Sequence, residues 1–267
     1  MIRSLPNGVI PVIALEVEWY LRAESAVEDA SQYIENFLKW FTASAAHLPL
    51  HSASGERGYL QAEAALLPTK NINQLITDYY TLRDVAENSA RKIGAQADFS
   101  AKPFAEDYGS GIHVHVHLED KTGQHLFFKD GESLSDALRF SIGGLLSTLE
   151  ENLPIFIPTS SSWQRIVPGF HAPVNVSWGF NNRTTAIRLP DSISEYQGAR
   201  AIAAAPATRF KRIEHRVAGS DANIENVIDA VLKGIDKGLI ERIEPPEPIF
   251  GNAQDMQYAL KNLREKA

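Results

Sequence analysis

The stretch IHVHVHL at residues 112–118 limits what this chain can fold into more than any other segment. Apolar residues and histidines alternate strictly there, and a period of two places them on opposite faces of an extended strand. The segment LEVEWYL at residues 15–21 alternates in the same way, with Glu16 and Glu18 on its polar side. Half-buried strands of this kind predict an antiparallel sheet with one face in the core and one polar face.

Strands and helices are mixed along the chain without a regular strand–helix–strand period. Sequence patterns predict strands at residues 11–22, 59–67, 97–102, 111–119, 124–128, 173–179, 184–189 and 211–217. They predict helices at residues 25–45, 72–93, 133–150, 222–239 and 254–264. Residues 50–58 are predicted to form a loop, and residues 154–172 to be irregular. This order favours an α+β fold with a largely antiparallel sheet, in a single domain covering residues 1–267, over a doubly wound parallel fold.

Two helix ends carry recognisable local signals. Ser25 and Glu28 form a capping-box pattern at the start of the first predicted helix. Gly94 follows the second predicted helix at the place where a left-handed residue ends many helices. For the helix near residue 222, either Asp221 or Asn223 is predicted to mark the beginning.

The overall composition excludes several classes of protein. The chain has no cysteine, which rules out disulfides, thiolate metal sites and cysteine nucleophiles. The formal net charge is −7, which argues against a nucleic-acid partner and against a polybasic membrane anchor. The N-terminal segment does not resemble a signal peptide, and no apolar run reaches the roughly 20 residues of a membrane span. We therefore expect a cytoplasmic protein with no nucleic-acid or membrane partner.

Four predicted strands carry charged or metal-binding groups at every second position. These groups are Glu16, Glu18, Gln61, Glu63, His113, His115, His117, Arg212, Glu214 and Arg216. Several carboxylates with a histidine on one face would repel one another unless cations neutralised them, which favours Mg²⁺ or Mn²⁺. Two alternatives remain at this point: a zinc site built on the His-X-His pattern, and a solvated face with no ligand.

Arginine is concentrated in the second half of the chain. The arginines concerned are Arg165, Arg183, Arg188, Arg209, Arg212 and Arg216. A planar guanidinium binds phosphate or carboxylate oxygens in pairs, so arginines near metal-held phosphates suit phosphoryl transfer. The chain has neither a GxxxxGK[ST] loop nor a GxGxxG fingerprint, so neither a P-loop nor a Rossmann site is indicated.

The order of these motifs is similar to that of one known family. The segments are EVEWYL (16–21), ERGYLQAE (56–63), KPFAEDYGSGIHVHVHL (102–118), PTSSSWQRIVPGFHAP (158–173), NVSWGFNNRTTAIRLP (175–190), KRIEHRVAGSDAN (211–223) and GNAQDMQY (251–258). In this order they resemble the catalytic domain of glutamine synthetase and of its γ-glutamyl-amine ligase relatives. The resemblance implies an antiparallel sheet curved into a half-barrel and flanked by helices.

The resemblance also implies roles for individual residues. The positions that match the family's ligands for Mg²⁺ or Mn²⁺ are Glu18, Glu56 and Glu63 for one ion, and Glu16, His113 and Glu214 for the other. The positions that match its ATP or phosphate contacts are His115, Arg183, Arg188, Arg209 and Arg212. Gly109, Arg165 and Arg216 match positions at the amino-acid substrate, and Arg183 and His171 match catalytic positions. His117 falls where relatives carry a serine, and its role stays open.

The implied reaction is an ATP-dependent ligation of L-glutamate, or a similar carboxylate, to ammonia or another amine. The carboxylate first takes the γ-phosphoryl group of ATP, and the amine then displaces phosphate. The main alternative is a truncated, non-catalytic paralogue that binds ATP and metal and acts as a partner or regulatory subunit.

Three departures from the family pattern bear on the second substrate. The chain begins almost directly at residues 16–21, which predicts that the family's N-terminal β-grasp domain is absent. The chain is then expected to form a homo-oligomer or to bind a partner subunit that supplies the β-grasp domain. His171 stands where the family carries a glutamate that takes a proton from ammonium, and Tyr108 stands where an asparagine contacts glutamate. Together these changes predict that ATP and metal binding are kept while the amine is changed.

Overall fold

The computed structural model describes residues 5–127, 134–190 and 212–266. In these residues one open, eight-stranded sheet has the order β2-β3-β1-β5-β8-β7-β6, and β4 pairs with β1 beside this path. Every pairing is antiparallel except that of β6 with β7. The predicted α+β class and the mostly antiparallel sheet flanked by helices are confirmed.

The long strand β1 (Ile10–Ala23) lies at the centre of the sheet. It pairs with β3 (Gln61–Leu66) on one side and with β5 (Ile112–Glu119) on the other. The alternation predicted for β1 is confirmed. Its apolar side chains Leu15, Val17, Trp19 and Leu21 are buried, and Glu16 and Glu18 lie on the opposite face. The indole of Trp19 packs against Phe41 at a ring distance of 5.5 Å.

Strand β2 (Leu50–Gly55) corrects the loop predicted at residues 50–58. Its sequence, LHSASG, is polar and ends in glycine, which is typical of loops. The backbone nevertheless pairs with β3 and forms the edge of the sheet. An edge strand has one exposed side, so a polar sequence is compatible with it.

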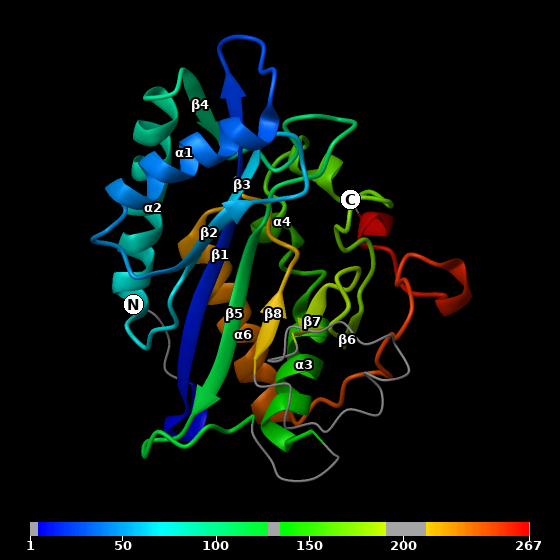
Figure 1. Cartoon of the computed structure of the whole chain (residues 1–267). Helices are drawn as coiled ribbons and strands as arrows, with labels where there is room; N and C mark the ends of the chain where they lie inside the picture. Colours follow the sequence, from blue (N-terminus) through cyan, green and yellow to red (C-terminus); the bar gives the residue numbers. More distant parts are fainter. Residues whose placement is uncertain (1–4, 128–133, 191–211, 267) are drawn as a thin grey trace.

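The other strands are shorter than the sequence predicted. Strand β4 (Ala95–Asp98) begins two residues before the predicted segment and pairs with the end of β1. Beyond β5 lie β8 (Ile213–His215), β7 (Ile187–Leu189) and β6 (Trp178–Phe180). Figure 1 shows β5 and β8 side by side in the middle of the molecule, with β7 and β6 beyond them.

Helices α1 (Ala30–Ser44) and α2 (Ile72–Arg91) pack on the apolar side of β1. Helix α1 begins five residues later than predicted, and Asp29 caps it by accepting a hydrogen bond from the Gln32 amide at 3.0 Å. The Ser25–Glu28 pattern is therefore not the cap. After α2 the chain adopts a positive φ of 67° at Gly94, as the sequence predicted.

Helices α3 (Asp136–Thr148) and α6 (Ile224–Glu241) pack closely on each other, and α6 lies behind the sheet in Figure 1. Glycines allow this close approach. A Cβ atom on Gly144 would lie 2.1 Å from the Gly234 carbonyl oxygen and 2.6 Å from the Gly238 Cα. The Asn223 side chain caps α6, which decides between the two predicted starting residues.

The remaining described elements are single turns: 3₁₀ turns at Pro6–Gly8, Ser162–Arg165, Met256–Tyr258 and Leu263–Lys266, and the short helix α4 (Leu153–Phe156). The final helix predicted at residues 254–264 is therefore wrong. The amide of Leu263 bonds instead to the Val174 carbonyl at 2.9 Å, and that of Val176 bonds to the Lys261 carbonyl. These long-range bonds replace the i to i−4 bonds that a helix needs.

The prediction of a strand at residues 124–128 is also wrong for residues 124–127, the part of it that the structure describes. His125 makes only an isolated bridge with Glu119 after the turn at Gly123. The Leu126 amide donates to the Leu118 carbonyl at 2.8 Å, so the segment folds back on the end of β5 without forming a ladder.

Candidate active site

Three strand pairings bring the predicted ligands onto one face of the sheet. In the register of the ladder, Glu16 on β1 stands opposite His113 on β5, and Glu18 on β1 stands opposite Glu63 on β3. On the other side of β5, His115 stands opposite Glu214 on β8. Residues opposite one another in neighbouring strands share a face, so the polar sides of these four strands form one floor.

The side chains on this floor contact one another directly. The Nδ1 atom of His113 lies 3.0 Å from Glu16 Oε1 and 3.5 Å from Glu214 Oε1. The Nε2 atom of His115 lies 3.2 Å from Glu16 Oε2. These contacts join Glu16, His113 and Glu214, which are the predicted ligands of one ion.

This floor is shielded from solvent. Glu18 is 8% exposed, His113 2% and Glu214 0%. Charged residues are almost never buried to this degree without a partner or a metal ion. The alternative of a solvated polar face is therefore wrong for these three residues.

Two groups of side chains within the described residues could each hold a metal ion. One is Glu16, Glu18 and His113, and the other is Glu16, His115 and Glu214. Within each group the ligand atoms lie within 4.8 Å of one another. Glu16 belongs to both groups, and Glu56 and Glu63 belong to neither.

Glu56 and Glu63 still contribute negative charge to the site. Burial, followed by the carboxylates of Glu16, Glu18 and Glu56, raises the pKa of Glu63 to about 10. Burial and the neighbouring Glu18 carboxylate also raise the pKa of Glu56. Raised carboxylate pKa values mean that the floor carries more acidic groups than its side chains alone allow to ionise together.

The donor set fits a divalent cation that prefers oxygen. The Nε2 atom of His113 is buried and has no hydrogen-bond partner in the structure. A buried, unpartnered imidazole nitrogen next to acidic groups is a ligand atom available to a metal. Two carboxylates and one histidine in each group are ligands that a divalent metal ion accepts.

Backbone contacts fix the position of Glu18. Its Oε2 atom accepts a hydrogen bond from the Gly111 amide at 2.7 Å, and its carbonyl accepts one from the Ser220 hydroxyl at 2.6 Å. A Cβ atom on Gly111 would lie 2.5 Å from Arg165 Nη2 and 3.1 Å from His113 Nε2. Glycine at this position therefore lets the loop, the arginine and the histidine meet.

Three of the predicted arginines are tied to the acidic floor. Arg188 Nη1 donates to Glu214 Oε2 at 2.8 Å, and Arg216 also forms an ion pair with Glu214. Burial opposes ionisation of Glu214, but the two guanidinium groups outweigh it and hold its pKa well below the usual value. Arg212 Nε donates to His115 Nδ1 at 3.2 Å. Arg209 lies outside the described residues.

The substrate positions predicted by the resemblance meet at one point. Arg165 is buried and donates to the carbonyls of Val217 and Arg216 at 3.0 and 3.1 Å. Burial lowers its pKa to about 10, and a group with that pKa stays charged at neutral pH. A Cβ atom on Gly109 would lie 2.5 Å from Arg165 Cγ, so a side chain there would displace the arginine.

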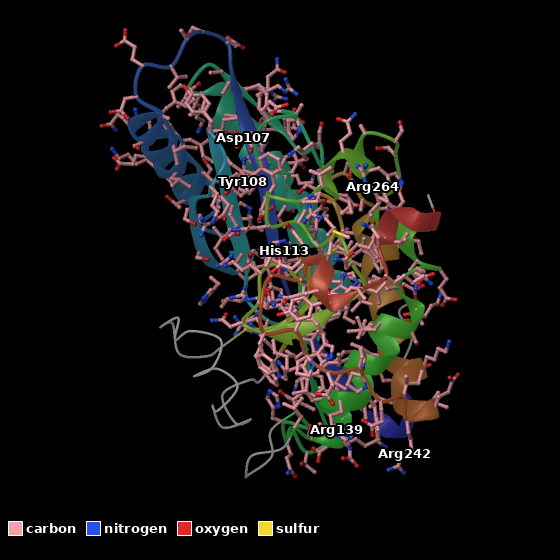
Figure 2. All side chains as sticks on the ribbon, turned by 90° about the vertical axis from the view of Figure 1, so that its right-hand side faces the viewer. Asp107, Tyr108, His113, Arg139, Arg242 and Arg264 are labelled. Atoms are coloured by element: carbon pink, nitrogen blue, oxygen red, sulfur yellow. The ribbon has the colours of Figure 1, made fainter. Side chains whose placement is uncertain are left out.

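A cleft joins the metal-binding floor to these groups. Its lining residues are Glu18, Glu56, Arg57, Gln61, Tyr108, Gly109, His113, Arg165, Phe170, His171, Ala172, Arg183 and Arg216. In Figure 2, Tyr108 lies in the upper part of the molecule and His113 near its middle, while Arg139 and Arg242 lie at the lower end. His115 and Arg212 line a separate recess together with His117, next to Glu16.

Aromatic rings form one wall of the cleft. The Tyr108 ring packs edge-to-face against Phe170 at 5.6 Å and against His171 at 5.7 Å. His171 has a positive φ of 56°, a strained conformation for a residue other than glycine. Burial, and then Arg57 and Arg183, lower the pKa of His171.

Sequence reasoning placed Gln61 on the polar face but missed its role as a link between loops, and it missed Phe170 and Arg57 altogether. Gln61 accepts a hydrogen bond from the Gly58 amide and donates to the Gly109 carbonyl, so it holds two loops of the cleft together. Phe170 and Arg57 line the cleft beside predicted residues. Phe170 directly precedes His171 and Arg57 directly follows Glu56 in the sequence, and this adjacency to predicted site residues was the signal that could have identified them.

His117 does not join the metal-binding groups. Its ring stacks on His125 at 4.4 Å, and its Nε2 atom lies 3.2 Å from Glu119 Oε1. A three-histidine site on β5 is therefore not formed.

Comparisons with known proteins agree with the fold. The family model for the glutamine synthetase catalytic domain matches residues 8–265. The γ-glutamylputrescine synthetase of Escherichia coli (strain K12) is 27% identical over 94% of this chain and 56% of its own length. The glutamine synthetase of Sulfolobus acidocaldarius is 35% identical over 67% of this chain and 36% of its own length.

The chain thus spans about half or less of these curated relatives. Among the described residues, no helix combines the length and the apolar character needed to cross a membrane.

The family match covers nearly every described element, including all four strands that form the acidic floor. The chain belongs to the family of glutamine synthetase catalytic domains.

Proposed function

We propose that this chain is an ATP- and divalent-metal-dependent ligase that joins the γ-carboxylate of L-glutamate, or a similar acid, to ammonia or another amine. The observation that carries the proposal is the cleft, where a buried carboxylate and histidine floor meets buried arginines. Membership of the glutamine synthetase family supports it. The expected cytoplasmic location belongs to the same proposal.

In this proposal Glu16, Glu18, Glu56, Glu63, His113 and Glu214 hold Mg²⁺ or Mn²⁺. When bound, the ions would neutralise phosphate charge and stabilise the transferring phosphoryl group. The arginines assigned to the phosphates are Arg183, Arg188, Arg209 and Arg212, together with His115. Arg165 and Arg216 bind the carboxylate substrate next to Gly109.

The proposed chemistry has two balanced steps. A γ-carboxylate oxygen attacks the γ-phosphorus of ATP, ADP leaves with the bonding electrons, and an acyl phosphate forms. The amine nitrogen then attacks the carbonyl carbon, the bond to the phosphate oxygen breaks, and inorganic phosphate leaves. His171 accepts the proton that the nitrogen loses, because its lowered pKa keeps the imidazole neutral at neutral pH.

One observation favours a second candidate, a non-catalytic paralogue that binds ATP and metal. His171 stands where the family pattern has the glutamate that takes a proton from ammonium, and Tyr108 stands where it has an asparagine that contacts the substrate glutamate. Such a paralogue would bind ATP in a metal-dependent way without completing the reaction, and it would serve as a partner or regulatory subunit.

A test of the two functions uses hydroxylamine, a small amine that is uncharged at neutral pH. Purified protein is incubated with ATP, Mg²⁺ or Mn²⁺, L-glutamate and hydroxylamine, and both phosphate and γ-glutamyl hydroxamate are measured. Hydroxamate formation supports the ligase. Metal-dependent ATP binding by calorimetry without turnover supports the paralogue. Absence of metal-dependent ATP binding contradicts both.

A further inference from the structure

The wall of the cleft around His171, the proposed base, has a chemical character that narrows the class of amine. Tyr108, Phe170 and His171 form a wall of three rings, and Tyr108 contacts the other two edge-to-face. Such a wall offers apolar surface to a flat group and few directional polar contacts. This inference rests on the proposed ligase function, and it concerns the second substrate of the same site.

The charges around His171 are predominantly positive. Three arginines lower its pKa in addition to burial: Arg57, Arg183 and Arg216. Arg165 lines the same cleft and stays charged at neutral pH. A cationic amine approaching His171 would therefore be repelled by guanidinium groups on several sides.

The carboxylates in this region are occupied by other contacts. Glu18 accepts the Gly111 amide, and both Glu18 and Glu56 are proposed metal ligands. The oxygens of Asp107 accept hydrogen bonds from the backbone amides of Tyr59 and Tyr108, at 2.8 and 2.7 Å. Among the described residues that line the cleft, these two glutamates are the only acidic groups, so none remains to pair with an ammonium ion.

A cation already lies over the aromatic wall. The Lys102 ammonium is 3.8 Å from the centre of the Phe170 ring and donates a hydrogen bond to the Asp107 carbonyl. Lys102 is only 8% exposed, so it is part of the structure of the wall. A second cation on the same ring would meet this positive charge, which makes a cation–π cage for an alkylammonium substrate unfavourable.

We propose that the amine substrate is an aromatic primary amine of the aniline class. Its nitrogen lone pair is delocalised into the ring, so it is uncharged at neutral pH and meets no repulsion from the arginines. The ring packs against Tyr108 and Phe170, and the amino group lies toward His171.

The proton balance of the reaction agrees with this substrate class. The nitrogen forms a bond to the carbonyl carbon as phosphate leaves, and one of its two protons passes to the neutral imidazole of His171. An arylammonium is a stronger acid than an alkylammonium. A histidine with a lowered pKa is therefore a sufficient base for the aromatic amine.

The test measures amide products with four amines under the same conditions: aniline, ammonium, putrescine and hydroxylamine. ATP, Mg²⁺ and L-glutamate are kept saturating at neutral pH, and products are separated by liquid chromatography and mass spectrometry. We expect kcat/KM for aniline to exceed that for putrescine and ammonium by about tenfold or more. Hydroxylamine reports acyl-phosphate formation for any class of second substrate.

Two variants locate the preference in the structure. His171→Glu introduces a carboxylate among the arginines. We expect the ratio of kcat/KM for aniline to kcat/KM for putrescine to fall by about tenfold. Tyr108→Asn removes part of the wall of rings. It should lower the ratio of kcat/KM for aniline to kcat/KM for hydroxylamine, mainly by raising KM for aniline. Both ratios come from the same protein sample, so a partly unfolded variant does not bias them. His47→Glu, at an exposed histidine outside the cleft, is the matched control and should change neither ratio.

Two results would overturn the inference in distinguishable ways. Hydroxamate formation with a preference for ammonium or putrescine over aniline refutes the aromatic amine and leaves the ligase function standing. Failure to form hydroxamate refutes the proposed function, and the amine assignment falls with it. The comparison of amines on the unmodified protein is decisive even when a variant does not fold.

Discussion

His113 and Glu16 stand directly opposite each other on β5 and β1, and His113 Nδ1 lies 3.0 Å from a carboxylate oxygen of Glu16. The second ring nitrogen of His113 is buried without a partner. One nitrogen therefore orients the ring while the other is left available. This is the usual arrangement for a metal-binding histidine, whose ring is positioned by a contact to its other nitrogen.

Glu16→Gln should reduce turnover by about 100-fold, because the glutamine keeps the shape of Glu16 and removes one ligand charge from both candidate metal groups. The same substitution should abolish the rise in Tm that Mg²⁺ or Mn²⁺ gives to the unmodified protein. Differential scanning fluorimetry with and without metal measures this shift. Glu87→Gln, on the exposed side of α2, is the control. An unchanged metal-induced shift in Glu16→Gln would remove Glu16 from the ligand set.

The pKa of His171 should lie below the value of about 6.5 that is typical of an exposed histidine. Burial and Arg57 both disfavour its protonated form, so the unfolded chain binds this proton more readily than the folded one. The contribution of His171 to stability is therefore fully present above about pH 6.5 and is lost as the pH falls through its folded-state pKa.

Arg57→Gln should raise the pKa of His171, because it removes one of the positive charges that act on the imidazole. The titration is followed by NMR on protein with labelled histidine, and His171 is assigned through its absence in His171→Asn. Arg91→Gln on α2, whose guanidinium pairs with Glu87, is the matched control and should leave the titration where it is. A His171 pKa unaffected by Arg57→Gln would show that burial alone sets it.

Gln61→Leu should destabilise the protein by about 2 kcal/mol, because the Gly58 amide and the Gly109 carbonyl lose a buried partner. It should also raise KM for the carboxylate substrate, since Gly109 packs against Arg165. Urea unfolding gives the first value and initial-rate kinetics give the second. A loss of stability with no change in KM would mean that the Gln61 bonds support the fold but do not position the loop. Gln96→Leu, at an exposed position on β4, is the control.

Gly144→Ala should destabilise the protein by about 2–3 kcal/mol, because the new methyl group would overlap the Gly234 carbonyl on α6. Helices α3 and α6 would have to separate, and both lie away from the acidic floor. Thermal unfolding measures the loss, and Lys233→Ala on the exposed side of α6 should change stability by less than about 0.5 kcal/mol. A variant of Gly144 as stable as the unmodified protein would show that the helices can adjust.

The central part of the fold could be predicted because its signals are local and strong. Strict alternation at residues 112–118 identified β5, and the same pattern in β1 identified both the core face and the face of Glu16 and Glu18. The apolar stripe of α2 and the positive φ at Gly94 followed from sequence as well. In each case the side chains that define the element also decide its burial.

Two of the errors fall where backbone pairing with distant segments decides the structure. The sequence of β2 is polar, yet pairing with β3 makes it an edge strand. The segment at residues 254–264 has helix-forming residues, but its amides and carbonyls bond to residues 174–176. Hydrogen bonds between segments far apart in the sequence cannot be read from the local pattern of either one.

By itself, the sequence determined which residue types line the acidic floor, because a period of two fixes the side of the strand on which Glu16, Glu18 and His113 lie. Only the tertiary structure decided which of them touch, because contact depends on the register between β1 and its two neighbours. It also decided the character of one wall of the cleft, where Tyr108, Phe170 and His171 come together from two separate loops. Loop residues have no periodicity, so their meeting in one wall depends on the packing of the whole domain.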